Sequence, residues 1–443
     1  MIAEPESGRV CLLPGLLVML GLACQPAVGL TLDEAYTTAL ENNQEVNQSL
    51  QQQLEAQAGV TEAKSRLYPS LEVSGFTVRQ KELTQTQLDS MGRPVERTFQ
   101  HAEDYQYQLE LRHHLYTGGK TWSGWSIRAM EAQEESYRHF RRKQEILYDV
   151  ARSYYDVLLA RRNREIARDS LERSRNQLER ARGRFEVGEL TRTGVLRSEV
   201  SVSRAEQELR QARNSLTVSY DQLALALGKD TVSETIETVE FNSMPDTPLK
   251  EYYRLALNNR KDLKQARARE RVTQERITWE KADYYPNIDL VSQVENRDKP
   301  RFSDETKDWN VRLVGTYPLF SGWQETSEVR QARLRNSAAE AAFKRMRRQV
   351  RVEIKNLYLE LKTQSKVIET ARSEVESARS NYEQITAEFE QGLVSSVSVN
   401  DALTALSEAE NRLANARYNF QLGLLRLKLA SGTFQEKRLR TSL

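Results

Sequence analysis

Apolar side chains along this chain recur with two different periods. Between residues 104 and 116 they alternate with polar ones, so that Tyr105 and Tyr107 share one face while Gln106 and Gln108 share the other. A period of two predicts a β-strand with one apolar face. Residues 309–319 alternate in the same way.

The segments that follow Pro69 and Pro286 are expected to pair with these two strands as long hairpins. Each hairpin closes through a polar stretch that contains a proline, and we expect a loop there. The strands are predicted at about 69–80, 104–116, 286–296 and 309–319, with loops at roughly 81–103 and 297–307.

Elsewhere the apolar positions follow the helical period. No proline interrupts residues 120–187 or 324–391, so each stretch can form a single helix ~100 Å long. Apolar and small residues recur in both at alternating steps of four and three, the spacing of a coiled-coil seam. The seam positions are Ala371, Val375, Ala378, Tyr382, Ile385 and Phe389, with Ala167, Leu171, Ser174, Leu178, Ala181 and Phe185 in the first helix.

Two further helices are predicted at residues 32–68 and 249–285. Thr31 is the expected N-cap of the first, and acidic residues follow in its first turn. Each of these helices ends at a proline, Pro69 or Pro286, because proline lacks the amide proton that a helix interior needs.

The chain is duplicated. An offset of 204 residues places Phe389 on Phe185 and Gly392 on Gly188, and an offset of 217 residues superimposes the two shorter helices. Internal repeats of this length indicate repeated structural units. The fold class that follows is mainly α-helical, with two helix-strand-strand-helix repeats at 30–228 and 249–432, a linker at 229–248 and a tail at 433–443.

The alternating strands fit two environments, a soluble half-buried sheet or a membrane. About 9 to 11 residues are enough for a tilted strand to cross a bilayer. Four strands cannot close a barrel, and open sheet edges are not tolerated in lipid, so the membrane alternative requires several chains to share one barrel.

Composition narrows these alternatives. With 29% charged residues and a mean hydropathy of -0.68, the chain cannot be a bundle of membrane helices. The apolar stretch at residues 10–22 has the length of a signal-peptide core, and we expect a signal peptide at 1–29, cleaved after Gly29. Both cysteines lie in this leader. A net charge of +2 gives no electrostatic footprint for nucleic acid.

No motif for catalysis is present. The chain has no HExxH, CxxC, Walker loop or GxSxG elbow, so we predict no enzyme activity, no cofactor and no metal site. His113 and His114 are adjacent on a predicted strand, and adjacent side chains point to opposite faces, so the pair cannot chelate one ion together.

Several motifs together identify a family. The string SxAExxLxxAR occurs at 203–213 and again at 407–417, the hairpins end in LYTGG and LFSGW, and LANARYNF stands at 413–420. With a leader and duplicated helix-strand-strand-helix units, the chain resembles the TolC family of outer-membrane channel proteins over residues 30–432.

The resemblance implies a homotrimer in which four strands per chain build one 12-strand barrel in outer-membrane lipid. The long helices would then form a hollow coiled-coil tunnel across the periplasm of a Gram-negative bacterium. It further implies a passive exit duct for efflux or type I secretion, which meets a periplasmic adaptor and an inner-membrane multidrug or ABC-type transporter. The alternative is a coiled-coil scaffold or spacer of the cell envelope, without a channel.

The resemblance also places a periplasmic gate at the turns around Gly188 and Gly392. Members carry two aspartates six and nine positions after the second glycine; here these positions are Ser398 and Asp401. One acidic ring of three carboxylates would remain, and it would attract cations. The alternative is that Asp401 only helps the returning helix to start, by its charge near the helix dipole.

The closing contacts of the gate depart from the family pattern. Phe389 stands in place of a tyrosine, Val394 in place of an arginine and Gly194 in place of an aspartate. These residues cannot form the hydrogen bonds that the resemblance implies. Either packing and other pairs hold the tip shut, with Arg192 and Arg197 as candidates, or the tip rests more open.

Overall fold

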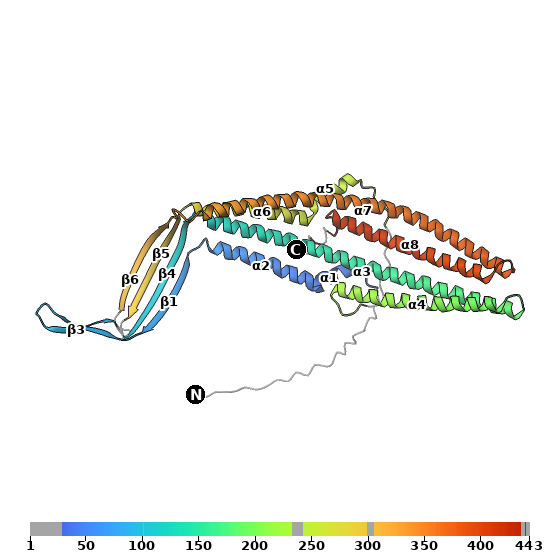
Figure 1. Cartoon of the computed structure of the whole chain (residues 1–443), viewed down its shortest axis with the longest axis horizontal. Helices are drawn as coiled ribbons and strands as arrows, with labels where there is room; N and C mark the ends of the chain where they lie inside the picture. Colours follow the sequence, from blue (N-terminus) through green and yellow to red (C-terminus); the bar gives the residue numbers. More distant parts are fainter. Residues whose placement is uncertain (1–28, 101, 233–241, 299–304, 436–438, 440–443) are drawn as a thin grey trace, which may run out of the picture.

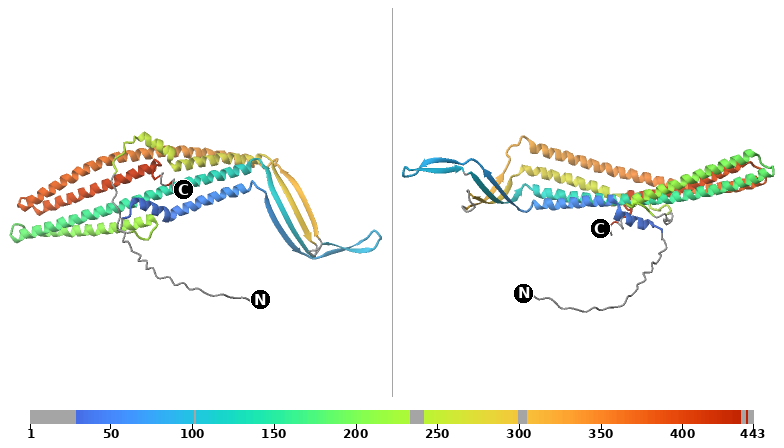
Figure 2. Two further views of the ribbon diagram at one scale, coloured as in Figure 1. Left: turned by 180° about the vertical axis from the view of Figure 1, so that it is seen from behind. Right: turned by 90° about the horizontal axis from the view of Figure 1, so that it is seen from below.

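The computed structural model describes residues 29–100, 102–232, 242–298, 305–435 and 439. The molecule is elongated, with strands at one end and the turns between long helices at the other (Figure 1). Two further views show the same separation of strands and helices (Figure 2). Among the helices in the described part of the chain, none is long and apolar enough to cross a bilayer. The predicted leader lies outside these residues, apart from its last position.

The strands form one antiparallel sheet in the order β1 (Ser70–Arg79), β4 (Glu103–Thr117), β5 (Asn287–Asp298) and β6 (Glu305–Thr316). All four overlap the strands that the alternating pattern predicted, although β6 spans 305–316 where 309–319 was expected. The sheet is open, because β1 and β6 each pair on one side only. Two strand edges therefore leave their backbone groups without a partner within the described residues.

The pairing register keeps the apolar residues on one face. Leu109 lies opposite Val73 on one side and Val294 on the other, and Val294 in turn lies opposite Trp309. Val73 and Trp309 are 75% and 76% exposed, so this apolar face is uncovered in the single chain.

The first hairpin loop is not the irregular stretch that we predicted at 81–103. It contains a two-stranded sheet of β2 (Leu83–Leu88) and β3 (Pro94–Gln100). The turn is closed by Asp89, whose side chain accepts hydrogen bonds from the amides of Met91 and Arg93 at 2.8 and 2.9 Å. We gave weight to the polarity of this stretch and not to its threonines and Asx turn, which favour a hairpin. In the second hairpin, residues 299–304 lie outside the described part.

Two pairs of long helices continue from the sheet. α3 (Lys120–Glu186) and α7 (Gln324–Glu390) each have 67 residues, as predicted. The chain then returns through α4 (Arg192–Leu227) and α8 (Ser396–Ala430). α3 has helices on both flanks, whereas α7 packs mainly against α5, α6 and α8. The outer flank of α7 is therefore uncovered.

The two shorter helices are each broken, where we predicted continuous helices. The first is α1 (Leu32–Asn42) and α2 (Gln44–Ser65), and the second is α5 (Leu249–Asn259) and α6 (Lys261–Lys281) with the short 3-10 turn η1 (Ala282–Tyr284). The Thr31 N-cap is confirmed, as a full capping box with Glu34.

The breaks occur because a side chain at each one binds the end of a neighbouring helix. Asn43 has an extended ψ of 123° and donates to the Ala226 carbonyl at 3.1 Å. Arg260 has a ψ of 122° and donates to the Ala430 carbonyl at 3.0 Å. The two contacts are equivalent under the duplication, since Ala226 and Ala430 are 204 residues apart.

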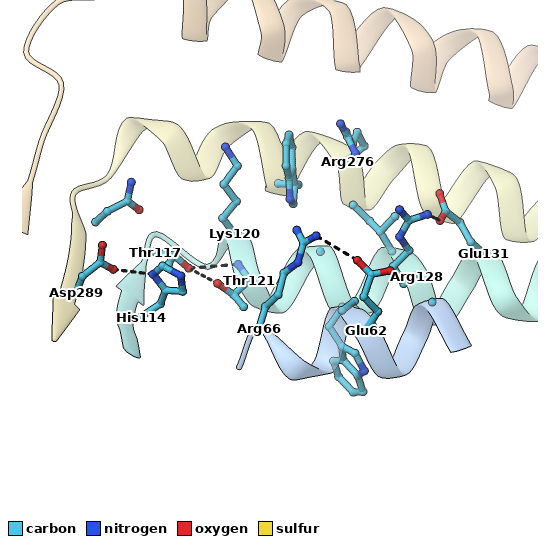
Figure 3. A pocket seen from close by; sticks show the side chains of 17 residues that line it. Glu62, Arg66, His114, Thr117, Lys120, Thr121, Arg128, Glu131, Arg276 and Asp289 are labelled. Carbon is cyan, nitrogen blue, oxygen red and sulfur yellow. Dashed lines mark hydrogen bonds and ion pairs between the residues drawn. The ribbon is translucent and has the colours of Figure 1, made fainter. Parts of the chain in front are cut away.

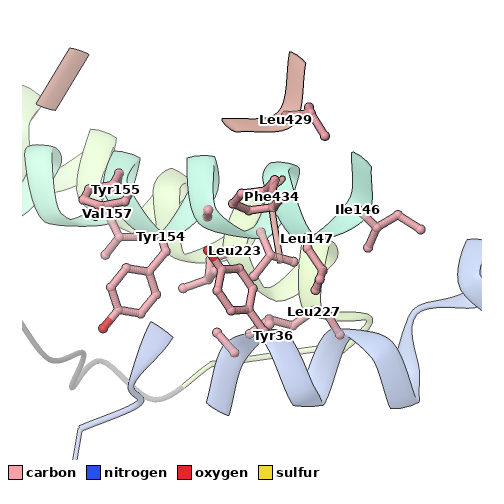
Figure 4. Packing of buried hydrophobic residues seen from close by; sticks show 14 of the residues in the cluster. Tyr36, Ile146, Leu147, Tyr154, Tyr155, Val157, Leu223, Leu227, Leu429 and Phe434 are labelled. Atoms are coloured by element: carbon pink, nitrogen blue, oxygen red, sulfur yellow. The ribbon is translucent and has the colours of Figure 1, made fainter. Parts of the chain in front are cut away.

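The main hydrophobic core lies at mid-length, where α1 packs across α3 and α4. Figure 4 shows Tyr36, Leu147, Tyr154 and Phe434 converging there. A second core joins α5, α7 and α8 and includes Ile354, which is fully buried. The helix breaks and both cores thus share one level of the molecule.

The predicted coiled-coil seam is buried in part. Ala371 and Phe389 are buried in α7, and Leu171, Ser174 and Ala181 in α3. Phe185 is an exception, because it is 44% exposed while its counterpart Phe389 is fully buried. The two tips therefore differ in their packing.

Candidate functional site at the helical tips

Both tips turn through a glycine in the left-handed region, at φ 79° for Gly188 and 83° for Gly392. The Gly188 amide donates to the Phe185 carbonyl at 3.0 Å, and the Glu189 amide donates to the Arg184 carbonyl at 2.8 Å. This pair of bonds is the Schellman arrangement, which needs a residue with positive φ. The prediction that these glycines form the turns agrees with this geometry.

The first returning helix leaves little room at Gly194. Thr191 caps α4, its hydroxyl accepting the Gly194 amide at 3.4 Å. A Cβ at Gly194 would lie 3.0 Å from Leu190 Cγ. The aspartate that the resemblance implies here would therefore require Leu190 to move.

On the second returning helix, Ser398 is half-buried and Asp401 is exposed. α8 begins at Ser396 and has no acidic residue in its first turn. The interpretation that Asp401 helps the helix to start is therefore wrong, because the effect of a charge on the helix dipole falls off within the first turn. The exposed Asp401 carboxylate is available to ions.

The remaining predicted gate residues are placed differently. Phe389 is fully buried and Val394 is half-buried. Arg192 and Arg197 are exposed and make no hydrogen bond or ion pair with the residues that the structure describes. Neither arginine joins the two tips within one chain.

Arg184, which we did not single out from the sequence, joins them. Its guanidinium lies 4.9 Å from the centre of the Phe389 ring and donates to the Phe389 carbonyl oxygen. Arg184 Nε also lies 3.2 Å from Glu189 Oε2. One arginine thus connects the α3–α4 turn with the end of α7, across chain segments that are 205 residues apart.

A difference between the two repeats signals this role. Under the offset of 204 residues, Arg184 aligns with Glu388, so the charge is reversed next to two equivalent phenylalanines. Arg180 lies 3.9 Å from Glu390 and adds a second, weaker link across the same joint. A comparison of the two repeats for positions of opposite charge could therefore have identified Arg184 from the sequence.

At the other end of the helices, a cavity of about 460 Å³ lies where α2, α3 and α6 meet the sheet (Figure 3). His114 Nδ1 lies 2.7 Å from Asp289 Oδ1 on the polar face of the sheet. Lys120 binds both carboxylate oxygens of Asp283 at 2.7 Å and stacks on Trp279 at 4.3 Å. The first pair joins β4 to β5, and the second joins α3 to η1 and α6.

One group of carboxylates within the described residues has the proximity that a metal would need. It comprises Glu280, Asp283 and Glu328. Lys120 already binds Asp283, and Arg276 binds Glu280 at 3.1 Å. Two of the three charges are therefore offset by the protein itself.

Comparisons with known proteins agree with this architecture. The chain matches the family described as "Outer membrane efflux protein" over residues 35–229 and 252–433. It is 25% identical to Outer membrane protein TolC of Vibrio cholerae, over 92% of this chain and 91% of that protein. It is 23% identical to Alkaline protease secretion protein AprF of Pseudomonas aeruginosa, over 93% and 86%.

Solved structures share the fold. The Campylobacter jejuni CmeC outer membrane channel has a TM-score of 0.79 and 15% identity, over 93% of this chain and 88% of that one. Its similarity covers both the strands and the long helices.

Proposed function

The chain belongs to the outer membrane efflux protein family, and on this premise we propose how its parts conduct, close and dock. It is an outer-membrane duct for efflux or type I secretion, which extends into the periplasm. One observation supports the assignment of the sheet to the membrane and of the helices to the periplasm. The sheet is open, has one uncovered apolar face and continues directly into helices of 67 residues.

The sheet supports a shared membrane barrel. Unpaired backbone groups are costly in lipid, so the β1 edge of one copy must pair with the β6 edge of the next. Channels of this family form homotrimers, and three copies of a four-stranded sheet close such a barrel. The apolar face with Val73 and Trp309 would then meet lipid.

The helical tips are proposed as the gate. In the closed state, Arg184 holds the α3–α4 turn against Phe389 of α7, in place of the contacts that the family pattern leads one to expect. Gly188 and Gly392 shape the turns, while Ser398, Val394, Gly194 and Arg197 line the same end of the helices. Asp401 supplies one exposed carboxylate per chain, which makes three around the axis of a trimer.

The tips are also the part nearest the inner membrane. A periplasmic adaptor and an inner-membrane transporter of the multidrug or ABC type are the partners proposed there, since channels of this family work with efflux or secretion systems. The relative AprF is named for alkaline protease secretion, which favours a polypeptide as one class of cargo.

Conductance in planar lipid bilayers tests the duct. The purified trimer should give discrete cation-conducting steps, whereas a scaffold or spacer would give none. Extraction provides an independent measurement, because a barrel requires detergent and a coiled-coil scaffold stays in the aqueous fraction. A chain that is extracted without detergent and conducts nothing would refute the proposal.

A further inference from the structure

A groove with a basic rim lies between α5 and α7. Its volume is about 290 Å³, and Val350 and Ile354 form part of its floor. The rim carries four cations, Lys344, Arg347, Arg348 and Arg351. Within the described residues, none of the three arginines is paired with a carboxylate. Within the described residues of one chain, this positive charge beside an apolar floor has no carboxylate to balance it at the three arginines.

The duplication provides an occupied copy of this groove. Under the two offsets, Arg348 aligns with Gln144 of α3, and Tyr253 of α5 aligns with Tyr36 of α1. Phe434, from the segment that follows α8, packs with Tyr36 in the main core (Figure 4). Gln144 Nε2 donates to the Phe434 carbonyl at 2.8 Å, and the Tyr36 and Phe434 rings are 6.2 Å apart.

The flank beside the basic groove is also uncovered. Val352 and Leu359 of α7 are 58% and 47% exposed. Their counterparts in α3 are Tyr148 and Tyr155, which take part in the main core, and the Tyr155 ring lies 6.3 Å from that of Tyr418 in α8. The flank of α3 that receives α8 thus has an exposed equivalent on α7.

The helix equivalent to α8 is α4, and it exposes the matching residues. Val218 and Leu225 are 53% and 78% exposed, although their counterparts Leu422 and Leu429 pack into the main core. After α4, the residue aligned with Phe434 is Asp230. A residue of opposite charge therefore stands where the basic groove would need one.

Within one chain α4 packs mainly against α3, with smaller contacts to α8 and α1. We propose that the α4 end of a second copy, from Val218 to Asp230, completes the α5–α7 groove, with Asp230 bound by Arg348. This inference rests on the proposed oligomer and goes beyond it by assigning the residues of its helical joint. Head-to-tail contacts of this kind close into a ring when the rotation allows it.

The two joints then differ in their chemistry. Inside the chain the groove is filled by an aromatic side chain, Phe434, whereas between copies it is filled by an ion pair. Exposed and partly exposed ion pairs weaken with salt, while apolar packing does not. Oligomer stability should therefore depend on salt through Arg348 and Asp230, although the fold of each chain should not.

Charge reversal tests the ion pair. Arg348→Glu should raise the dissociation constant of the trimer at least about tenfold at low salt, measured by sedimentation in detergent. Asp230→Arg in the same chain should restore assembly, because every joint then carries the reversed pair. Arg335→Glu, on the same helix but hydrogen-bonded to Gln331, is the matched control and should leave assembly unchanged.

Crosslinking tests the contact directly. Both native cysteines lie before residue 30, so the variant with Arg348→Cys and Asp230→Cys carries its only later thiols at the two sites. Under oxidation it should give dimers and trimers on denaturing gels, and each single variant should not. If the double variant forms a conducting trimer without a crosslink, the proposed contact between Arg348 and Asp230 is wrong and the proposed channel function is retained. If it crosslinks but the native trimer does not conduct, the proposed channel function is wrong and the proposed contact between copies is retained.

Discussion

The guanidinium of Arg184 stacks on Phe389 at 4.9 Å and donates to the carbonyl oxygen of the same residue. Removal of this side chain should loosen the closed tip, because no other described side chain of α3 hydrogen-bonds to the end of α7. We expect Arg184→Ala to raise mean single-channel conductance several-fold and to increase the entry of large antibiotics into cells. Arg182→Ala removes a nearby arginine whose partner is Glu199 within the same hairpin, and it should behave like the unchanged protein.

Asp401 should govern block by cations. The side chain is exposed, and three copies near one axis would concentrate multivalent cations at the entrance. Asp401→Ala should weaken block of the single-channel current by such ions at least about tenfold. Glu408→Gln neutralises a carboxylate farther along α8 that is already paired with Arg412 at 3.5 Å. Equal block in the Asp401 variant and the unchanged channel would remove the acidic ring from the mechanism.

His139 should make stability depend on pH. It is 4% exposed, and burial, assisted by the charge of Lys143, lowers its pKa from 6.5 to about 4. The unfolded chain then binds a proton that the folded chain excludes. The contribution of neutral His139 to the free energy of unfolding is complete above pH 6.5 and is lost as the pH falls toward about 4.

The loss should amount to something on the order of 3 kcal/mol per chain. Thermal unfolding between about pH 8 and about pH 4 would measure it. His139→Gln retains a group that can bind Ser49, the present partner of Nδ1 at 2.7 Å, and it should flatten this part of the pH profile. An identical profile in both proteins would contradict the assignment.

The turn glycines should differ in their tolerance of a side chain. Gly188 and Gly432 both have positive φ, but a Cβ at Gly188 meets nothing within 4 Å, whereas at Gly432 it would lie 2.7 Å from the Arg260 amide nitrogen. Gly188→Ala should therefore cost only the left-handed strain, about 1 to 2 kcal/mol. Gly432→Ala should cost clearly more, because the obstacle is backbone.

Thermal unfolding in detergent compares the two glycine variants. Gly183→Ala serves as the control, since this glycine lies inside α3 with open space around it. Alanine should stabilise that helix by up to about 1 kcal/mol. If Gly188→Ala proved as damaging as Gly432→Ala, the backbone contact at Gly432 would not be the cause.

The sequence predicted the elements whose period is sustained. The 67-residue helices and the four long strands lie where the pattern placed them, because each repeats one period over many turns or pairs. The breaks at Asn43 and Arg260 were missed, since they depend on carbonyl groups that lie 183 and 170 residues away. A local pattern contains no information about such partners.

The turns at the helical tips were predictable from the sequence, but the contact that joins the two tips was not. The glycines identified the turns, because positive φ restricts the choice of residue. Arg184 escaped notice because its partner, the Phe389 backbone, has no side-chain signature and comes from the other repeat. The exposure of Phe185 and the burial of Phe389 likewise follow from which tip the arginine contacts, and periodicity treats the two residues as equal.

The mid-length core has a mechanical consequence for the tips. Beyond Val157, which is fully buried in that core, α3 continues for about 30 residues to its end, or ~45 Å. The core then acts as a fulcrum and the distal part of the helix as a lever arm. A rotation of about 6° displaces the end of such an arm by about 5 Å, which exceeds the length of a hydrogen bond. A small rotation at the fulcrum is enough to separate Arg184 from Phe389.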